Sequence, residues 1–331
     1  MLDYGWLVNN MYLWFLPSKF NFGRSGTSNP YVYTVTLIHP FQFLLMDRLA
    51  FELLPATYLF LALSIIPPSY AQNASTSWPG WDRISNLFVF GDSYTTTGFE
   101  VNGTQPNPSN PFGNPDFPGR TFSNGRNWVD FLTYTYNGSF VATYDFAVGG
   151  AIIDGGTTPS RFTPMNQQVQ QFFLPNYSPN NTVKVKWASN NTLFASFFGI
   201  NDINKTYKLS ANSTRIHSTI ITSYTQLVEQ LYQAGARNFL FLNVPPIHRA
   251  PLTANQGNMS EMLVERNRVA VVDFNMRISN MVLRLTQQHT DVTAFLFDTF
   301  TLFNEVLDDP EVKEETAMYS NTTGFCFAYS T

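Results

Sequence analysis

From residue 72 onward, short apolar runs alternate with segments that have helical periodicity. The apolar runs that end at glycine, proline or polar residues predict strands, and these runs are 87–90, 140–148, 192–198, 238–244 and 293–297. Helical spacing is found at 128–136, 164–174, 214–234 and 259–288, and a long loop rich in Asn, Pro and Gly is expected at 102–125. Strands that are apolar throughout and separated by helices indicate an α/β fold, here a five-stranded parallel sheet with helices on both faces.

Polar or glycine-rich residues follow three of these predicted strands. The first strand ends at Gly-Asp-Ser (91–93), the second at Gly-Gly (149–150) and the third at Gly-Ile-Asn-Asp (199–202). In open parallel sheets, ligands bind beyond the carboxyl ends of the strands. The pattern therefore predicts a site at this edge. Each motif taken singly has a plainer interpretation, as a turn, as loop punctuation or as a helix N-cap.

Composition narrows the class of protein. Hydrophobic residues make up 44% of the 331 residues and charged residues 13%, which is typical of a chain with a large packed core. The formal net charge of −4 gives no basic footprint for nucleic acid. No Gly-x-Gly-x-x-Gly or Gly-x₄-Gly-Lys-Ser/Thr motif is present, and no ligand spacing suggests a metal, so no cofactor is expected.

The N-terminal part resembles a targeting sequence rather than a domain. The apolar run 53–66 follows Met46-Asp47-Arg48 and precedes a small-residue exit at Ala71, as in a secretory signal peptide. It is shorter than the roughly 20 residues of a membrane span, although a retained anchor is an alternative. We expect residues 46–71 to be the signal peptide and 72–331 the domain. Residues 1–45 are then a gene-model extension, or else a real extension that packs on the domain.

Asparagine-linked glycosylation motifs support an extracellular, secreted protein. Asn-x-Ser/Thr acceptors recur throughout the chain, at Asn73, Asn102, Asn137, Asn176, Asn180, Asn190, Asn204, Asn212, Asn258 and Asn321. The single cysteine, Cys326, indicates a missing partner if the protein is secreted. We expect a monomeric glycoprotein without stable membrane association.

The three motifs together resemble those of one enzyme family. Residues 90–98 (Phe-Gly-Asp-Ser-Tyr-Thr-Thr-Thr-Gly) are similar to the first block of the GDSL/SGNH hydrolases, with Tyr94 in place of the usual Leu. Residues 145–151 resemble the second block and 199–202 the third, in the same order and at strand ends. The resemblance covers roughly residues 84–331 and is closest to secreted fungal members, which include acetylesterases acting on plant cell-wall carbohydrate. It implies a three-layer, flavodoxin-like fold.

The resemblance also implies roles for individual residues. Ser93 would be the catalytic nucleophile, and Ser93, Gly150 and Asn201 would form the oxyanion hole, with Gly149 as an alternative to Gly150. The chemistry suits these residue types, because ester hydrolysis needs a nucleophile and donors for the developing oxyanion. Asp92 is expected to shape the turn rather than to act as the base, and Tyr94 either lines the cleft or packs in the core.

The family's general base is absent from the sequence. It comes from a C-terminal Asp-x-x-His block, and no Asp-x-x-His occurs in the 331 residues. His39 precedes the signal peptide, His217 and His289 are expected on helix surfaces, and His248 follows the fourth strand without matching the family's base. We therefore expect the chain to be truncated before the block, to lack the last part of the fold and to be inactive or nearly so.

The substrate is left open at this stage. The first hypothesis is a serine ester hydrolase whose full-length form removes acetyl groups from plant cell-wall carbohydrate by a Ser-His-Asp acyl-enzyme mechanism. Its substrate would be a small-molecule or oligosaccharide ester. The alternatives are a lipase or broad acyl hydrolase, and a non-catalytic secreted glycoprotein. Trp78, Trp81, Phe99 and Trp128 are candidates to stack on sugar rings, but each can equally pack in the core.

Overall fold

The computed structural model describes residues 20–22, 32–37, 78–123, 125–157, 162–179, 185–255 and 257–324. The predicted signal peptide, its cleavage region and Cys326 lie outside these residues. The described helices are α2 (Trp128–Tyr134), α3 (Met165–Gln167), α4 (Leu174–Tyr177), α5 (Ile200–Thr206), α6 (Ser213–Gln233), α7 (Pro251–Ala254), α8 (Ser260–Gln288) and α9 (Thr299–Asp308).

The five predicted strands form a parallel sheet. They are β3 (Asn86–Gly91), β4 (Ala142–Asp145), β5 (Thr192–Phe197), β6 (Asn238–Leu242) and β7 (Thr293–Phe297). The strand order is β7-β6-β5-β3-β4, and all neighbouring pairs among these five are parallel. This is a doubly wound arrangement with its crossover beside β3. The expected α/β fold is therefore confirmed.

Two further strands extend the sheet beyond β7. β2 (Val32–Leu37) pairs parallel with β7, and β1 (Phe20–Phe22) pairs antiparallel with β2. The sheet thus has seven strands, two more than the pattern predicted. Periodicity gave little signal before residue 46, but 32–37 (Val-Tyr-Thr-Val-Thr-Leu) is rich in the β-branched and aromatic residues that suit strands. The proposed domain boundaries stay a prediction.

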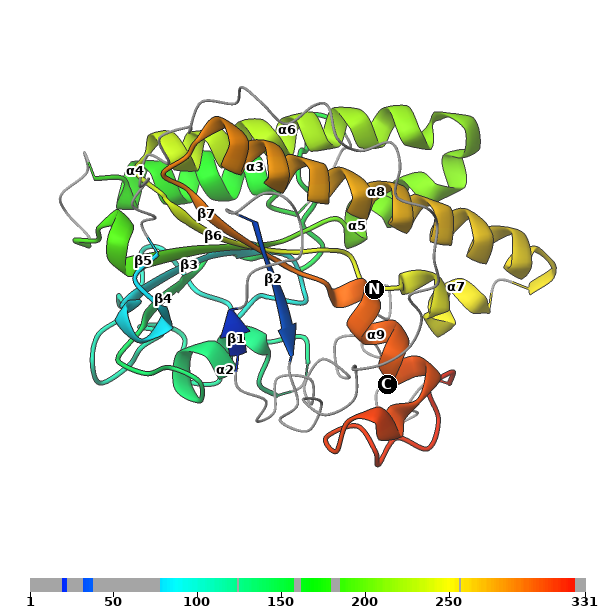
Figure 1. Ribbon diagram of the computed structural model, residues 1–331, viewed down its shortest axis with the longest axis horizontal. Helices are drawn as coiled ribbons and strands as arrows, with labels where there is room; N and C mark the ends of the chain where they lie inside the picture. The colour runs from blue at the N-terminus through cyan, green and yellow to red at the C-terminus, as the bar shows by residue number, and fades with distance from the viewer. Residues whose placement is uncertain are drawn as a thin grey trace, which may run out of the picture.

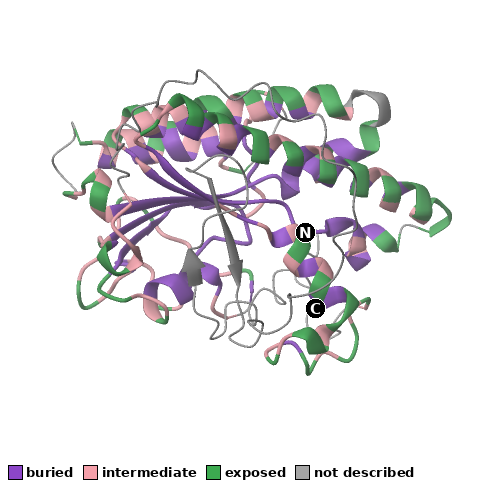
Figure 2. Ribbon diagram, in the orientation of Figure 1, coloured by how far each residue is buried: buried purple, intermediate pink, exposed green. Residues whose placement is uncertain are grey.

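Helices cover both faces of the sheet. Figure 1 shows α3, α6 and α8 on one face and α2 on the other. All residues of β3, β4, β5 and β6 are buried, and Figure 2 shows the strands buried between helices whose outer faces are exposed. Burial on both sides explains why the strands are apolar throughout rather than alternating. The core is rich in aromatic rings, with Phe88 and Phe173 at 5.1 Å between centroids.

The helix predicted at 164–174 is irregular. α3 continues into a π-helical segment, Gln168–Phe173, and then into α4. A π-helical turn widens the helix and is often found at functional sites. Here it carries Gln168, which is fully buried and reaches the end of β3. Three short helices, α5, α7 and α9, were not predicted, because each has little length in which to show a period. α5 and α9 also follow their strands directly.

Candidate active site

Ser93 lies in a tight turn directly after β3. The N–H groups of Thr95 and Thr96 donate to the carbonyl of Asp92, at 3.1 and 3.0 Å. A side chain at Gly91 would stand 2.6 Å from Oγ1 of Thr95, so this close approach requires glycine. Ser93 follows the end of β3, so it lies at the carboxyl edge of the sheet. β3 itself lies between β4 and β5. The side chain is largely buried, with 6% of the residue exposed.

Buried amide side chains fix the backbone on both sides of Ser93. Gln168 pairs with the Gly91 backbone, accepting from its N–H at 3.1 Å and donating to its carbonyl at 2.9 Å. Asn127, the N-cap of α2, donates through Nδ2 to the carbonyls of Thr95 and Thr96 at 2.6 and 3.1 Å. The turn therefore has little freedom to change shape. Sequence reasoning missed both residues, since neither belongs to a motif.

The aspartates of the second and third motifs cross-link separate segments. Asp145, at the end of β4, accepts from the N–H of Thr97 at 2.7 Å and from that of Ala147 at 3.0 Å. It thereby ties the serine turn to the segment after β4. Asp202, in α5, accepts from the N–H of Ile153 at 3.1 Å and ties α5 to that same segment. Each carboxylate thus joins two motifs that the sequence keeps far apart.

Asn201 connects all three motifs through one amide. Its Nδ2 donates to Oδ2 of Asp92 at 3.1 Å and to the carbonyl of Ala151 at 2.9 Å. Asp92 directly precedes Ser93, and Ala151 directly follows Gly150. Asp92 also accepts from the N–H of Tyr94 at 3.0 Å, so it shapes the turn as expected. The structure therefore brings Ser93, Gly150 and Asn201 to one edge of the sheet.

The three aspartates are fully buried, and burial dominates their ionisation. Desolvation raises the pKa of Asp92, Asp145 and Asp202 to about 7, against backbone N–H groups that lower it. The negative charge of Asp202 raises the pKa of Asp92 further. The site therefore contains carboxyl groups that change charge near neutral pH, although none hydrogen bonds the Ser93 hydroxyl.

Three backbone N–H groups in the first and second motifs have no acceptor in the described part of the chain. Within the described residues, the N–H groups of Ser93, Gly149 and Gly150 donate no hydrogen bond. The two glycines occupy the middle of a turn closed by the N–H of Ala151 on the carbonyl of Val148, at 3.0 Å. Gly150 has φ +79°, which suits the third position of a type II turn. Gly149 and Gly150 are partly exposed, so an acceptor that reaches this edge from outside would find these donors unengaged.

The Asn201 amide differs from these backbone donors. An amide NH₂ has two hydrogens, and both are directed at acceptors within the protein, Asp92 and Ala151. In this state Asn201 has no hydrogen left for an oxyanion. The expected third donor is thus in place but already engaged. It can serve a substrate only by releasing one of these bonds or sharing it.

His217 is a buried residue, so its expected surface position is wrong. Its Nδ1 lies 2.9 Å from Oδ2 of Asp273 and its Nε2 lies 3.0 Å from Oγ1 of Thr206. The residue has no exposed surface, because α6 turns it toward α5 and α8 rather than outward. Burial lowers its pKa, against the hydrogen bond and charge of Asp273. Both ring nitrogens are occupied, and none of these contacts reaches Ser93.

The other described histidines also make no hydrogen bond to Ser93. His289, directly after α8, is only half-buried and stacks on Tyr232 with 3.7 Å between centroids, while its Nε2 lies 2.8 Å from Glu229. His248 follows β6 and is buried, and desolvation lowers its pKa to about 4. Within the described residues, no imidazole contacts the Ser93 hydroxyl.

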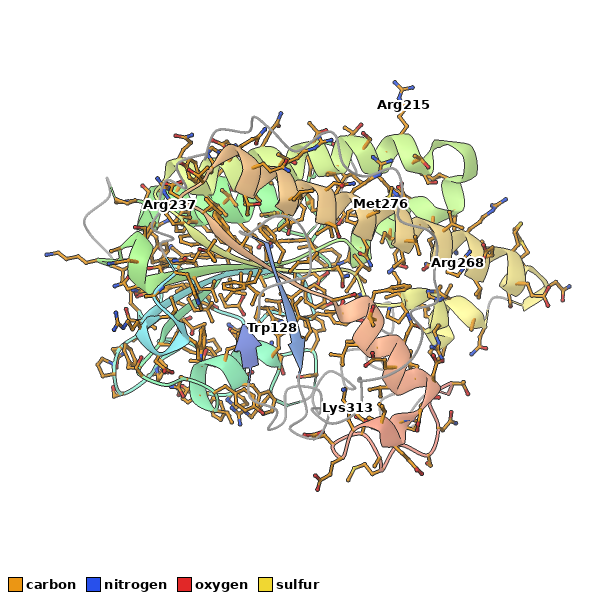
Figure 3. All side chains as sticks on the ribbon, in the orientation of Figure 1. Trp128, Arg215, Arg237, Arg268, Met276 and Lys313 are labelled. Atoms are coloured by element: carbon orange, nitrogen blue, oxygen red, sulfur yellow. The ribbon has the colours of Figure 1, made fainter. Side chains whose placement is uncertain are left out.

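The aromatic candidates for sugar stacking pack in or against the core. Trp128 is fully buried, and Figure 3 labels it in the interior between the sheet and α2. Trp78, Trp81 and Phe99 are partly buried against the same core. Tyr94 packs edge-on against Phe197, so the core interpretation holds for this substitution too. The side chains that lie over Gly149 and Gly150 come instead from loops.

In the described part of the chain, no group of three or more His, Cys, Asp or Glu side chains is placed to hold a metal ion. No described helix combines the length and the apolar character that crossing a membrane requires.

A parallel α/β sheet with a serine turn and unpaired N–H donors at its carboxyl edge contains the groups that ester hydrolysis by a serine nucleophile requires. Residues 87–325 match the family model described as GDSL-like Lipase/Acylhydrolase. This match spans most of the chain. The chain therefore belongs to the GDSL-like lipase/acylhydrolase family, whose members hydrolyse esters, and the family resemblance of the three motifs is confirmed.

Individual relatives include two fungal acetylesterases. An acetylesterase of Thermothelomyces thermophilus is 37% identical over 237 residues, covering 68% of this chain and 74% of the relative. An acetylesterase of Hypocrea jecorina is 26% identical, covering 54% of each. A thermolabile hemolysin of Vibrio parahaemolyticus is 29% identical, covering 70% of this chain and 49% of the relative.

Proposed function

We propose that this protein removes acetyl groups from plant cell-wall carbohydrate, with Ser93 as the nucleophile. The observation that carries the proposal is that Asn201 joins the residue before Ser93 to the residue after Gly150. Within the described residues, the N–H groups of Ser93 and Gly150 donate no hydrogen bond. The fungal acetylesterases among its relatives support an acetyl ester as the substrate.

The chemistry follows from this arrangement. Oγ of Ser93 attacks the ester carbonyl and forms a tetrahedral intermediate, whose oxyanion accepts from the N–H groups of Ser93 and Gly150. Collapse of the intermediate expels the sugar alcohol and leaves an acetyl group on Ser93, which water then hydrolyses. Asn201 supplies a third hydrogen bond if one of its two hydrogens leaves Asp92 or Ala151. The rigid turn keeps the backbone donors in place, so they need no rearrangement.

The general base is the missing part. An imidazole must take the Ser93 proton during attack and return it to the leaving group. His217 is engaged by Asp273 and Thr206, and His289 by Glu229. His248 is buried and makes no hydrogen bond to Ser93, and desolvation lowers its pKa to about 4. We propose that no histidine of this chain serves as the base, which makes turnover by the chain alone very slow.

The experiment uses small imidazole as a substitute for the base. The 331-residue protein is assayed with p-nitrophenyl acetate and p-nitrophenyl octanoate over a range of imidazole concentrations, and Ser93→Ala gives the blank for catalysis by imidazole itself. Turnover that rises with imidazole, needs Ser93 and prefers acetate supports the proposal. A preference for octanoate would indicate a lipase. The absence of any difference from Ser93→Ala would indicate a non-catalytic protein.

Secretion and glycosylation are proposed together. Four acceptor asparagines, Asn102, Asn190, Asn258 and Asn321, are exposed at the surface. Asn176 is less suitable, since its Nδ2 donates to the carbonyl of Phe172 at 2.8 Å. We expect the protein recovered from the medium of a eukaryotic host to lose mass on treatment with an N-glycosidase, and the exposed asparagines to carry the glycans.

A further inference from the structure

Two exposed phenylalanine rings lie at the glycine turn of the proposed oxyanion hole. Phe122 comes from the long loop before α2, and Phe162 from the segment before α3. The exposed fraction is 54% for Phe122 and 42% for Phe162. Large apolar side chains are usually buried, and among the described residues most aromatic rings belong to the buried core. Two exposed rings at the same edge therefore call for an explanation.

Both rings are seated directly on the two glycines. A methyl group at Gly149 would stand 2.5 Å from Cζ of Phe122, and one at Gly150 would stand 2.6 Å from Cδ2 of Phe162. Each ring thus fills the space where a side chain would be. Adjacent Cα atoms are about 3.8 Å apart, so both rings lie on the same turn. Glycine at these positions allows the rings to approach, which sequence reasoning did not foresee.

The position of the rings restricts what they can bind. Under the proposed function, the ester carbonyl lies at the N–H of Gly150, so a ligand on these rings is part of the same substrate. An acetyl group offers one methyl and cannot cover two rings. The remaining part of the substrate is the sugar. One face of a pyranose ring presents C–H bonds, and this apolar face packs well on the negative face of an aromatic ring.

We propose that Phe122 and Phe162 form a subsite that binds the pyranose ring carrying the acetyl group. This inference rests on the proposed function for its geometry, but it assigns residues that no motif contains. The rings bind the leaving-group side of the ester and hold the sugar against the glycine turn. They would favour acetylated carbohydrate over small alkyl acetates through binding, without taking part in the chemistry.

Binding of sugar to the full 331-residue protein tests the subsite without turnover. The probes are xylotriose and its acetylated form, titrated by ligand-observed nuclear magnetic resonance. We expect Phe122→Ala and Phe162→Ala each to weaken binding of both probes by roughly two- to tenfold, the range for a single aromatic contact. The matched control is Phe140→Ala, because Phe140 is 38% exposed but precedes β4 at the opposite edge of the sheet. It should leave the affinity unchanged.

A second pair of variants separates ring stacking from loss of structure. Phe122→Leu and Phe162→Leu keep an apolar side chain but lack the flat face, so they should lose affinity while unfolding at the wild-type temperature. Phe122→Tyr and Phe162→Tyr should each keep the affinity for both probes. Unchanged binding in both alanine variants overturns the subsite. The proposal is also overturned if the alanine variants lose affinity only for p-nitrophenyl octanoate, because the rings would then bind an acyl chain.

Failure of the proposed function looks different. It appears as imidazole-dependent turnover that does not need Ser93, with sugar binding and its dependence on the two rings intact. Failure of the subsite alone appears as Ser93-dependent turnover whose KM for acetylated xylotriose is the same in wild type, Phe122→Ala and Phe162→Ala.

Discussion

Two hydroxyl groups in this protein have opposite surroundings. The Ser93 hydroxyl lies beside unpaired backbone N–H groups, and no described imidazole contacts it. The Thr206 hydroxyl lies 3.0 Å from His217, which in turn lies 2.9 Å from Asp273. The second group has the order of a catalytic triad, yet Thr206 is buried and also donates to the carbonyl of Asp202 at 2.8 Å.

A hydroxyl–imidazole–carboxylate chain therefore does not by itself make a hydrolase site. Catalysis also needs access for the substrate and donors for the oxyanion. The Thr206 group satisfies every polar atom that it contains, which is the mark of a structural network joining α5, α6 and α8. The N–H groups of Ser93 and of the nearby glycine turn donate no hydrogen bond among the described residues, as the proposed oxyanion hole requires.

The largest effect should separate the two hydroxyls by covalent labelling. A fluorophosphonate reacts with an activated serine, and imidazole in the buffer supplies the base. We expect labelling of wild type at Ser93, a loss of about 10³-fold or more in Ser93→Ala, and near-wild-type labelling in Thr206→Val. Mass spectrometry of peptides locates the label. Labelling of Thr206, or labelling that persists in Ser93→Ala, would reverse the comparison.

The next effect concerns Asn201. Replacing it with alanine removes the amide that joins the three motifs and a potential oxyanion donor, which typically costs about 10²- to 10³-fold in rate. We expect imidazole-dependent turnover of p-nitrophenyl acetate to fall by about 10²-fold. Asn204→Ala, on the partly exposed side of the same helix, is the control and should keep its rate. An equal fall in both variants would indicate damage to α5 rather than loss of a donor.

A smaller effect is expected in the pH dependence of stability. Burial raises the pKa of Asp92 from 3.8 to about 7, so the folded protein holds this proton between about pH 4 and 7 while the unfolded chain releases it. The contribution of Asp92 to the free energy of unfolding is therefore greatest below pH 4 and is lost as the pH rises through 7. A shift of this size is worth at most about 4 kcal/mol, at about 1.4 kcal/mol per pKa unit.

Urea unfolding at pH 4.5 and 7.5 measures this contribution. In Asp92→Asn, the loss of stability between the two pH values should be smaller than in wild type by roughly 2 to 3 kcal/mol, within the limit set by the pKa shift. The comparison cancels the cost of the substitution that does not depend on pH. Equal losses in the two proteins would show that Asp92 does not titrate in this range.

The smallest effect is expected at the second hydroxyl group. His217→Leu leaves Thr206 and Asp273 without their imidazole partner, and unmaking such buried bonds costs about 1 to 3 kcal/mol. We expect the free energy of unfolding to fall by about 2 kcal/mol, while turnover per folded molecule is unchanged. A specific loss of turnover at full stability would assign His217 to the chemistry after all.

Much of the fold could be predicted because its strands are buried on both faces. Strands of this kind are continuous apolar runs, so β5 and β7 were located to within one residue of their bounds. α5 and α9 were missed because short helices that follow a strand directly show no period. β1 and β2 were missed because residues before 46 show little periodicity, and because β2 pairs with β7, which lies far along the chain, while β1 pairs only with β2.

At the site, the sequence located the motifs but not their connections. The segments containing Ser93, Gly150 and Asn201 stand at strand ends and could be recognised by order and residue type. Gln168, Asn127, Phe122 and Phe162 belong to no motif. They act on the site only because the fold brings a helix, an N-cap and two loops to one edge. His217 was misplaced because helical periodicity does not show that α8 lies against that face of α6.

The sequence by itself determined the family and the order of the elements, since both depend on residue types at short range. The tertiary structure alone decided which donors are free. It paired the Asn201 amide with Asp92 and Ala151, left the N–H groups of Ser93, Gly149 and Gly150 unpaired, and enclosed the only described imidazole–carboxylate–hydroxyl chain elsewhere. The physical reason is that a donor pairs with the acceptor that the fold places within hydrogen-bonding distance, and separation along the sequence does not determine that distance.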